Sequence, residues 1–146
     1  MSPQESIVAV ARSWLKTPYV LQGRIKGVAA DCIGHVEMTG KECGYIPFDY
    51  EAPAYRTDIH GLVLLRECNK IMTRINAIEL GCVVAMRFRG RDMAQHLAVV
   101  GNYRAGGWSL IQAMDSLDKK GRVVEHNLSS DSMKRIDAVY RMRWDM

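Results

Sequence analysis

The stretch TPYVLQGRIKGVAADCIGHV, residues 17–36, combines a glycine-rich loop with a helix start, and the rest of the chain is interpreted around it. Gly23, Gly27 and two alanines precede Asp31-Cys32, and the residues that follow, up to Cys43, are predicted to form a helix. Cys32 is therefore expected in the first turn of that helix, at its positive end. The partial charge and unpaired N–H groups there favour a thiolate, the nucleophilic form of cysteine. The sequence thus predicts a nucleophilic Cys32.

Length and composition predict one folded domain over residues 1–146. Hydrophobic residues make up 48% of the chain and charged residues 25%, which are ordinary values for a globular protein with a single core. No apolar run is long enough to cross a bilayer, so no membrane span is expected. The N-terminal MSPQESIVAV lacks the features of a cleaved signal peptide. We therefore expect synthesis in the cytoplasm, or transport by a route that needs no cleaved signal.

Charge and cysteine content limit the classes of partner and cofactor that the sequence predicts. The net charge of +4 favours an anionic surface such as a cell wall or nucleic acid, but the basic residues are scattered and no nucleic-acid module is predicted. The four cysteines form no CxxC pair, and reduced thiols are expected. Cys32, His35 and Cys43 have no paired downstream ligands that would complete a zinc module. No cofactor or metal is therefore predicted.

The first half of the chain carries helix signals. Ser2 is a predicted N-cap, Pro3 occupies the first helical position, and Glu5 completes a capping box. The helix is expected to end before Pro18, because a residue preceding proline is disfavoured in the α region. Its predicted apolar face consists of Ile7, Val8, Ala11, Trp14 and Leu15.

The middle of the chain is predicted to contain a long loop and a second helix. Glycines, prolines and three tyrosines between Thr39 and Thr57 indicate a long loop, and its part from Ile46 to Thr57 is a candidate wall of a binding cleft. Asp58 is a candidate cap for a second helix from Ile59 to about Thr73. Leu62, Leu65 and Met72 keep roughly helical spacing in that segment.

The second half of the chain has the pattern of strands. Short β-branched or aromatic runs alternate with glycine-containing turns, which predicts an antiparallel meander. Helices followed by strands give an α+β fold, with the N-terminal helices covering one face of a C-terminal antiparallel sheet. The predicted strands are Cys82 to Phe88, Gln95 to Val100, Trp108 to Met114, Arg122 to His126 and Ala138 to Met142.

A cysteine nucleophile requires a base and a group that orients the base. His96 opens an apolar strand, which would hold it rigidly, and is preferred over the alternatives His35, His60 and His126. Gln112 is the polar residue of the next strand and could accept the imidazole N–H. Tyr19 could donate a hydroxyl toward a developing oxyanion, beside the backbone N–H of Cys32.

Each of these residues also has a plainer interpretation. A cysteine in an apolar helix is usually a small core residue, and Cys43, Cys68 and Cys82 are interpreted in that way. A histidine at a strand start is usually a hydrogen-bonded structural residue, and Gln112 could face solvent on an edge strand. Tyr19 could contribute packing alone. Their combination in one chain is what points to catalysis.

The joint order of the motifs resembles the NlpC-type family of papain-like cell-wall peptidases, in particular its branch from phages, prophages and gene transfer agents. The resemblance rests on ARSWLKTPY at 11–19, KGV at 26–28 and DCIG at 31–34. It extends through CVVAMRF at 82–88, QHLAV at 95–99, IQA at 111–113 and GRVVEH at 121–126, and so covers nearly the whole chain.

The resemblance implies a papain-like fold with Cys32 as nucleophile, His96 as base, Gln112 as orienting residue and Tyr19 near the oxyanion site. Asp31 would cap the helix or help to bind a substrate amine. The implied reaction is amide hydrolysis in peptidoglycan stem peptides, commonly between D-glutamate and a diamino acid. Partners would be peptidoglycan peptides and phage tail proteins, with the protein carried in a phage-like particle to the cell wall.

The chain departs from the family pattern at four places. Ile33 replaces a frequent serine, which weakens the expectation of a site for a free N-terminal amine, and Gln112 replaces a frequent histidine. Leu80-Gly81-Cys82 stands where Pro-Gly-Asp is common, and His35 replaces a usually apolar residue that would either tune the thiol or fill space. Alternatives to the peptidase are a structural tail component with a vestigial hydrolase fold, and an amidase or acyltransferase with the same triad.

Overall fold

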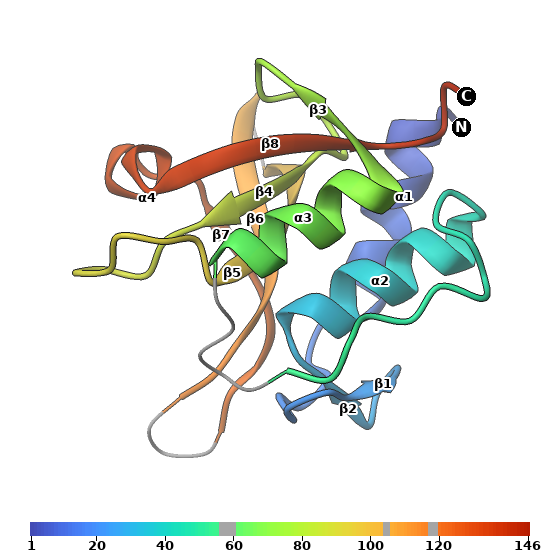
Figure 1. Cartoon of the computed structure of the whole chain (residues 1–146), viewed down its shortest axis with the longest axis horizontal. Coiled ribbons are helices and arrows are strands. Elements are labelled where there is room, and N and C mark those ends of the chain that lie inside the picture. The colour runs from blue at the N-terminus through green and yellow to red at the C-terminus, as the bar shows by residue number, and fades with distance from the viewer. Residues whose placement is uncertain (56–60, 104–105, 117–119) are drawn as a thin grey trace.

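A computed structural model describes residues 1–55, 61–103, 106–116 and 120–146. Its first three helices lie against a six-stranded antiparallel sheet, which confirms the predicted α+β class (Figure 1). The helices are α1 (Pro3–Ser13), α2 (Cys32–Cys43), α3 (Gly61–Ile71) and α4 (Ser130–Lys134). The strands are β1 (Arg24–Ile25), β2 (Ala29–Ala30), β3 (Met72–Ile75), β4 (Val83–Met86), β5 (His96–Tyr103), β6 (Gly107–Met114), β7 (Arg122–Asn127) and β8 (Ile136–Met142).

Helix α1 begins as its sequence predicts. The Ser2 side chain accepts a hydrogen bond from the Glu5 backbone N–H, and the Glu5 carboxylate accepts one from the Ser2 backbone N–H, so the capping box is complete. Trp14 is the C-cap and is buried. Leu15 was expected on the apolar face but is 37% exposed, because it follows the C-cap and no longer keeps the helical periodicity.

The large sheet has the strand order β3-β8-β4-β5-β6-β7. Strands β4 to β7 form the predicted meander, with Val99 opposite Ile111 in β5 and β6. The placement of β8 differs from the prediction, because β8 returns across the sheet and pairs with both β3 and β4. This return is set by pairing between segments far apart in the chain, which the sequence pattern within β8 does not specify.

The second predicted helix ends about two residues earlier than expected. Its predicted start at Asp58 and Ile59 lies outside the described residues, and α3 ends at Ile71. Met72 is buried within β3 instead of continuing the helix, and Leu62 is 67% exposed. The β-branched residues Thr73 and Ile75 favour the strand, where they pair with β8.

The sheet buries apolar residues on both of its faces. One face, which includes Val83, Val99 and Ile111, forms the main core with side chains of α1, α2 and α3. The other face forms a second cluster that includes Val84 and Val100, against which Leu128 packs. The helices therefore cover one face as predicted, while strand ends and connecting segments cover part of the other.

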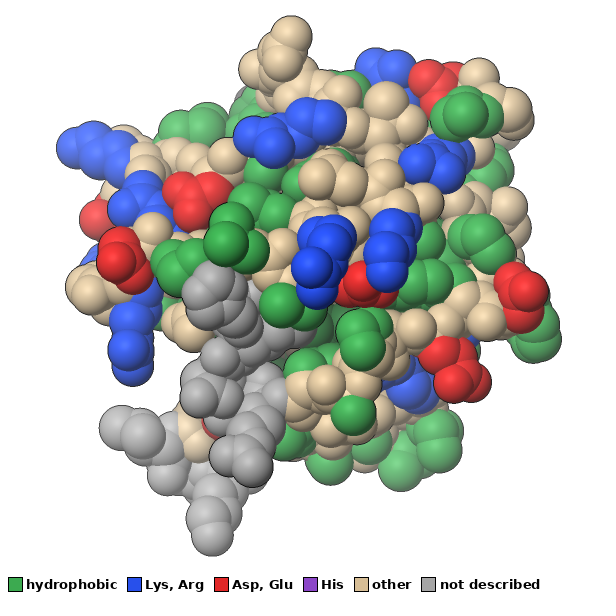
Figure 2. All heavy atoms as spheres, viewed as in Figure 1, with side chains coloured by type: hydrophobic (Ala, Val, Ile, Leu, Met, Phe, Trp, Pro, Cys, Tyr) green, Lys and Arg blue, Asp and Glu red, His purple; other side chains and the backbone are tan. Residues whose placement is uncertain are grey.

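The surface carries charges of both signs. Figure 2 shows lysine and arginine side chains interspersed with acidic and apolar ones on the face where α3 lies, with no single large basic area. No helix within the described ranges is long and apolar enough to cross a membrane.

Candidate active site

Cys32 is presented by a small hairpin that leads directly into α2. Strands β1 and β2 pair antiparallel, so the predicted glycine-rich loop is a hairpin whose turn contains Gly27 with φ of 78°. A positive φ of this kind favours glycine. Asp31 follows β2 as the N-cap, and Cys32 is the first residue of α2. The sequence therefore places the thiol at the helix start, as expected.

A cleft of about 90 Å³ lies at the end of the sheet where β5 begins and β6 ends. Its lining includes four of the five predicted site residues, Tyr19, Asp31, Cys32 and His96. Cys32 is 8% exposed and His96 is 5% exposed, so both lie at the bottom of the cleft and not on an open surface. The chain thus brings together a thiol and an imidazole that are 64 positions apart in the sequence.

Gln112, the fifth predicted site residue, lies behind the histidine. Its Oε1 is 2.8 Å from Nε2 of His96, a contact between adjacent strands β5 and β6. With the amide oxygen as acceptor, Nε2 carries the proton and Nδ1 is left with a lone pair. The Phe88 ring packs over the imidazole with a centroid separation of 5.4 Å. The histidine is therefore held in one orientation and one tautomer.

The resting state of the pair is neutral. The pKa of Cys32 is raised to about 12, mainly by burial; the Asp31 carboxylate contributes to the increase, whereas the backbone N–H of Leu97 opposes it. Burial also lowers the pKa of His96, against the opposing effect of the hydrogen bond to Gln112. The thiolate predicted from the helix start is therefore not the resting form, because desolvation outweighs the partial charge of the helix end.

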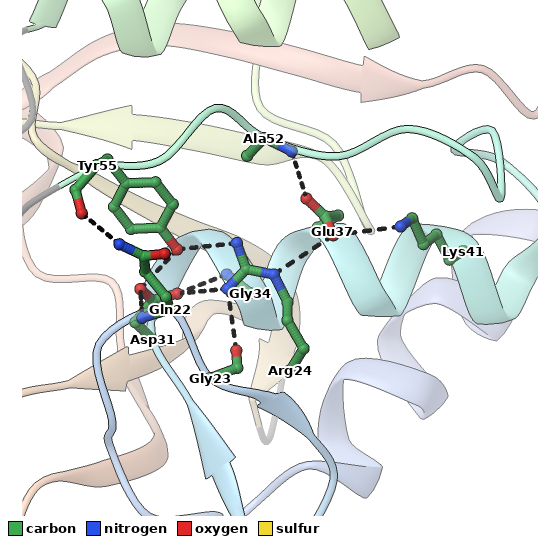
Figure 3. Close-up of polar contacts among 9 residues, drawn as sticks. All are labelled: Gln22, Gly23, Arg24, Asp31, Gly34, Glu37, Lys41, Ala52 and Tyr55. Carbon is green, nitrogen blue, oxygen red and sulfur yellow. Dashed lines mark hydrogen bonds and ion pairs between the residues drawn. The ribbon is translucent and has the colours of Figure 1, made fainter.

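Asp31 is a hydrogen-bond acceptor for several groups around the helix start (Figure 3). It is 1% exposed and accepts from the backbone N–H of Gly34 at 2.7 Å and of Gln22 at 2.6 Å. The Tyr55 hydroxyl donates to it at 2.6 Å and Arg24 Nη1 donates at 3.3 Å. The carboxylate therefore acts as the predicted cap, and its oxygens are occupied by groups of the protein itself.

Two tyrosines from different loops line the cleft. Tyr19 lies after α1, and burial together with the nearby Cys32 raises the pKa of its phenol, which therefore remains an O–H donor. Tyr55 belongs to the middle loop, so the described part of that loop does line the cleft, as expected for Ile46 to Thr57. Residues 56–57 of the predicted wall lie outside the described residues.

Of the other histidines within the described residues, neither His35 nor His126 lines the cleft. His35 is completely buried, its Nε2 is 3.1 Å from the Ala11 carbonyl oxygen, and its ring meets that of Trp14 edge-on. It therefore fills space between α1 and α2, the second of its two predicted roles. His126 is exposed in β7, and His60 lies outside the described residues.

The sequence interpretation missed Arg24 and Tyr55. Arg24 was one basic residue among many, although it and Lys26 are the two charged residues in a loop that is otherwise mostly small and apolar, which could have drawn attention to it. Tyr55 was one of three tyrosines in the middle loop. Within the described ranges, no group of three or more His, Cys, Asp or Glu residues is arranged to hold a metal ion, and the four cysteines are free thiols.

The fold is similar to those of solved NlpC/P60 domains. A crystal structure of a lipoprotein-like protein of the NLP/P60 family from Staphylococcus aureus superposes with a TM-score of 0.61 at 14% identity. That alignment covers 96% of this chain but 41% of the staphylococcal one, so this chain spans less than half of that protein's length. The NlpC/p60 domain of the peptidoglycan hydrolase SagA superposes with a TM-score of 0.59 at 17% identity, covering 95% of this chain and 98% of that domain.

Sequence comparison gives no assignment of its own: no family model and no curated protein matches the chain. The two superpositions show that the chain has the papain-like α+β fold of NlpC/P60 domains.

Proposed function

We propose that the protein is a cysteine peptidase that hydrolyses amide bonds in peptidoglycan stem peptides, with Cys32, His96 and Gln112 as its triad. The observation that carries the proposal is that His96 and Cys32 line one cleft, with His96 Nε2 2.8 Å from Oε1 of Gln112 behind it. The NlpC/P60-like fold and the wall-directed activity named for one structural relative support the choice of substrate. The motif order described above supports a phage- or prophage-associated protein that reaches the wall in a particle.

The reaction would begin with a neutral pair. As Sγ of Cys32 attacks the scissile carbonyl carbon, its proton passes to Nδ1 of His96, and the carbonyl π electrons move to oxygen. The backbone N–H of Cys32 and the hydroxyl of Tyr19, two residues that line the cleft, would donate to that oxyanion. Gln112 keeps accepting the hydrogen bond from Nε2–H of His96, so the imidazolium is formed in a fixed orientation.

Collapse of the tetrahedral intermediate breaks the C–N bond, and the imidazolium gives its proton to the departing amine. The thioester left on Cys32 is then cleaved by water, whose proton is taken by His96. The carboxylic acid product leaves and the thiol recovers its proton. An amidase or acyltransferase would share every step up to the thioester and differ in the acceptor, which product mass spectrometry distinguishes.

The test compares two alanine variants on one helix. Purified peptidoglycan and stem peptides are incubated with the protein, and new amino groups are measured. Cys32→Ala should release no amines above background, whereas Cys43→Ala, at the opposite end of α2 and half-buried, should retain activity. Equal amine release by the wild type and Cys32→Ala would remove the proposed function.

A second candidate function is a structural role in tail assembly. The observation that favours it is the burial of the thiol, which is 8% exposed and whose pKa burial raises to about 12. Site-resolved iodoacetamide labelling discriminates between the two. A catalytic Cys32 should label faster than Cys68 and Cys82, which are also buried, while equal slow labelling of the three favours the structural role.

A further inference from the structure

Arg24 lies at the centre of a partly buried polar cluster that joins three segments of the chain (Figure 3). Its Nη1 donates to the Gly23 carbonyl at 3.0 Å and to Asp31 at 3.3 Å, and its Nη2 donates to the Tyr55 hydroxyl at 2.9 Å. Its Nε is 3.4 Å from Glu37. One side chain therefore connects β1, the start of α2 and the middle loop.

The Tyr55 hydroxyl is fixed by two charged partners of opposite sign. It accepts from Arg24 and gives its single proton to Asp31 at 2.6 Å. The Gln22 side-chain amide also donates to the Tyr55 carbonyl at 2.7 Å. This arrangement holds the phenol ring in the wall of the cleft that contains Cys32. Loss of the arginine would free one side of that wall.

The absence of a side chain at Gly34 makes room for the arginine. A Cβ atom at Gly34 would lie 2.6 Å from Arg24 Nη1 and would also collide with the Gly23 carbonyl oxygen. The guanidinium is therefore packed directly against the first turn of the helix that begins at Cys32. Its charge lies beside the Asp31 carboxylate, which immediately precedes the thiol.

We propose that Arg24 is a positioning residue of the candidate active site: it neutralises Asp31 beside Cys32 and fixes Tyr55 as the wall of the cleft. The proposal deepens the proposed function, because it concerns the same thiol. An unpaired Asp31 charge would oppose formation of the thiolate. The ionisable groups around the thiol are Tyr19 from the loop after α1, Asp31 at the start of α2, Tyr55 from the middle loop, Cys68 from α3, His96 from β5 and Asp115 after β6.

The experiment measures the alkylation rate of Cys32 by iodoacetamide, resolved from the other cysteines by peptide mass spectrometry, between pH 6 and pH 10. Arg24→Met should lower the Cys32 rate about tenfold at each pH, corresponding to a shift of about one unit in the thiol pKa. Arg24→Lys keeps the positive charge and should stay within about twofold of the wild type. Lys41→Met is the matched control, because Lys41 contacts Glu37 at 3.3 Å as Arg24 does.

A double-variant cycle separates charge from packing. Asp31→Asn keeps a residue that caps helices well but removes the negative charge. In the Arg24→Met background it should restore the alkylation rate, a recovery that a purely structural role of Arg24 would not produce. An unchanged rate in Arg24→Met, an equal loss in Lys41→Met, or no recovery in the double variant overturns the proposal.

The test remains decisive if Arg24→Met does not fold. Asp31→Asn alone should then raise the Cys32 rate above that of the wild type, and Arg24→Lys should remain close to it; failure of either result overturns the proposal. Alkylation reports the ionisation of Cys32 whether or not a peptide is hydrolysed. A negative result here is therefore distinct from a failure of the proposed peptidase activity.

Discussion

Replacement of His35 by leucine should make the protein more resistant to acid. Burial lowers the pKa of His35 to about 4, although its contact with the Ala11 carbonyl acts in the opposite direction. The imidazole is therefore neutral in the folded protein. Among the described residues, its Nδ1 has no hydrogen-bond partner, so none of them would accept a hydrogen bond from a protonated Nδ1. Protonation consequently favours the unfolded chain, where the ring is solvated.

The magnitude follows from proton linkage. In the unfolded chain the histidine pKa is about 6.5, and in the folded protein it is about 4. Because the unfolded state binds more protons between these values, the free energy of unfolding falls as the pH falls through this window. Between pH 7 and pH 5 the loss due to His35 is about 2 kcal/mol. His96 acts in the same direction but is present in both proteins.

The substitution itself should be mild at neutral pH. Leucine is apolar and of similar size, and the Ala11 carbonyl keeps a second donor in the Trp14 backbone N–H. We expect His35→Leu to change the free energy of unfolding at pH 7 by less than about 1.5 kcal/mol. At pH 5 the variant should gain about 2 kcal/mol relative to the wild type.

The assay is urea unfolding followed by tryptophan fluorescence at pH 5, 6 and 7. His126→Gln, an exposed position on β7, controls for the loss of one histidine and should follow the wild type. Parallel losses of stability in the wild type and in His35→Leu between pH 7 and pH 5 would refute the reasoning. In that case His35 would be solvated in the folded protein and not sealed between the helices.

The remaining predictions concern the cleft and its support. Gln112→Leu removes the acceptor of His96 Nε2 and should lower kcat for stem-peptide hydrolysis about 100-fold; a wild-type kcat would show that the imidazole is oriented by other contacts. Gly34→Ala introduces a Cβ against Gly23 and Arg24, so it should lower the free energy of unfolding by about 1–2 kcal/mol despite the better helix propensity of alanine. Chemical denaturation measures this loss, and a stabilised variant would contradict it.

Features with local causes were predicted well. The capping box of Ser2 and Glu5 involves residues three positions apart, and the start of α2 at Cys32 is set by the adjacent Asp31. The short apolar and β-branched runs of β5 and β6 likewise indicated strands correctly. In each case the interacting groups are close in the sequence, so the pattern contains the information that fixes the structure.

Features that depend on contacts between residues far apart in the chain could not be predicted from local sequence patterns. The pKa of Cys32 depends on how deeply the packed domain buries it, and this effect exceeds the local influence of the helix start. Met72 has helical spacing, yet it joins β3 because β8 is available as a pairing partner. The hydrogen bond between Arg24 and Tyr55 joins residues 31 positions apart, and Tyr55 belongs to a loop without regular periodicity.

The position of β8 has a consequence for how the chain folds during its synthesis. Residues 136–142 occupy the gap between β3 and β4, which precede them by fifty positions or more. During synthesis on the ribosome, the edge of β4 that pairs with β8 would therefore remain unpaired until the C-terminal residues emerge from the exit tunnel. A nascent chain that is arrested before residue 136 should expose that edge and recruit chaperones.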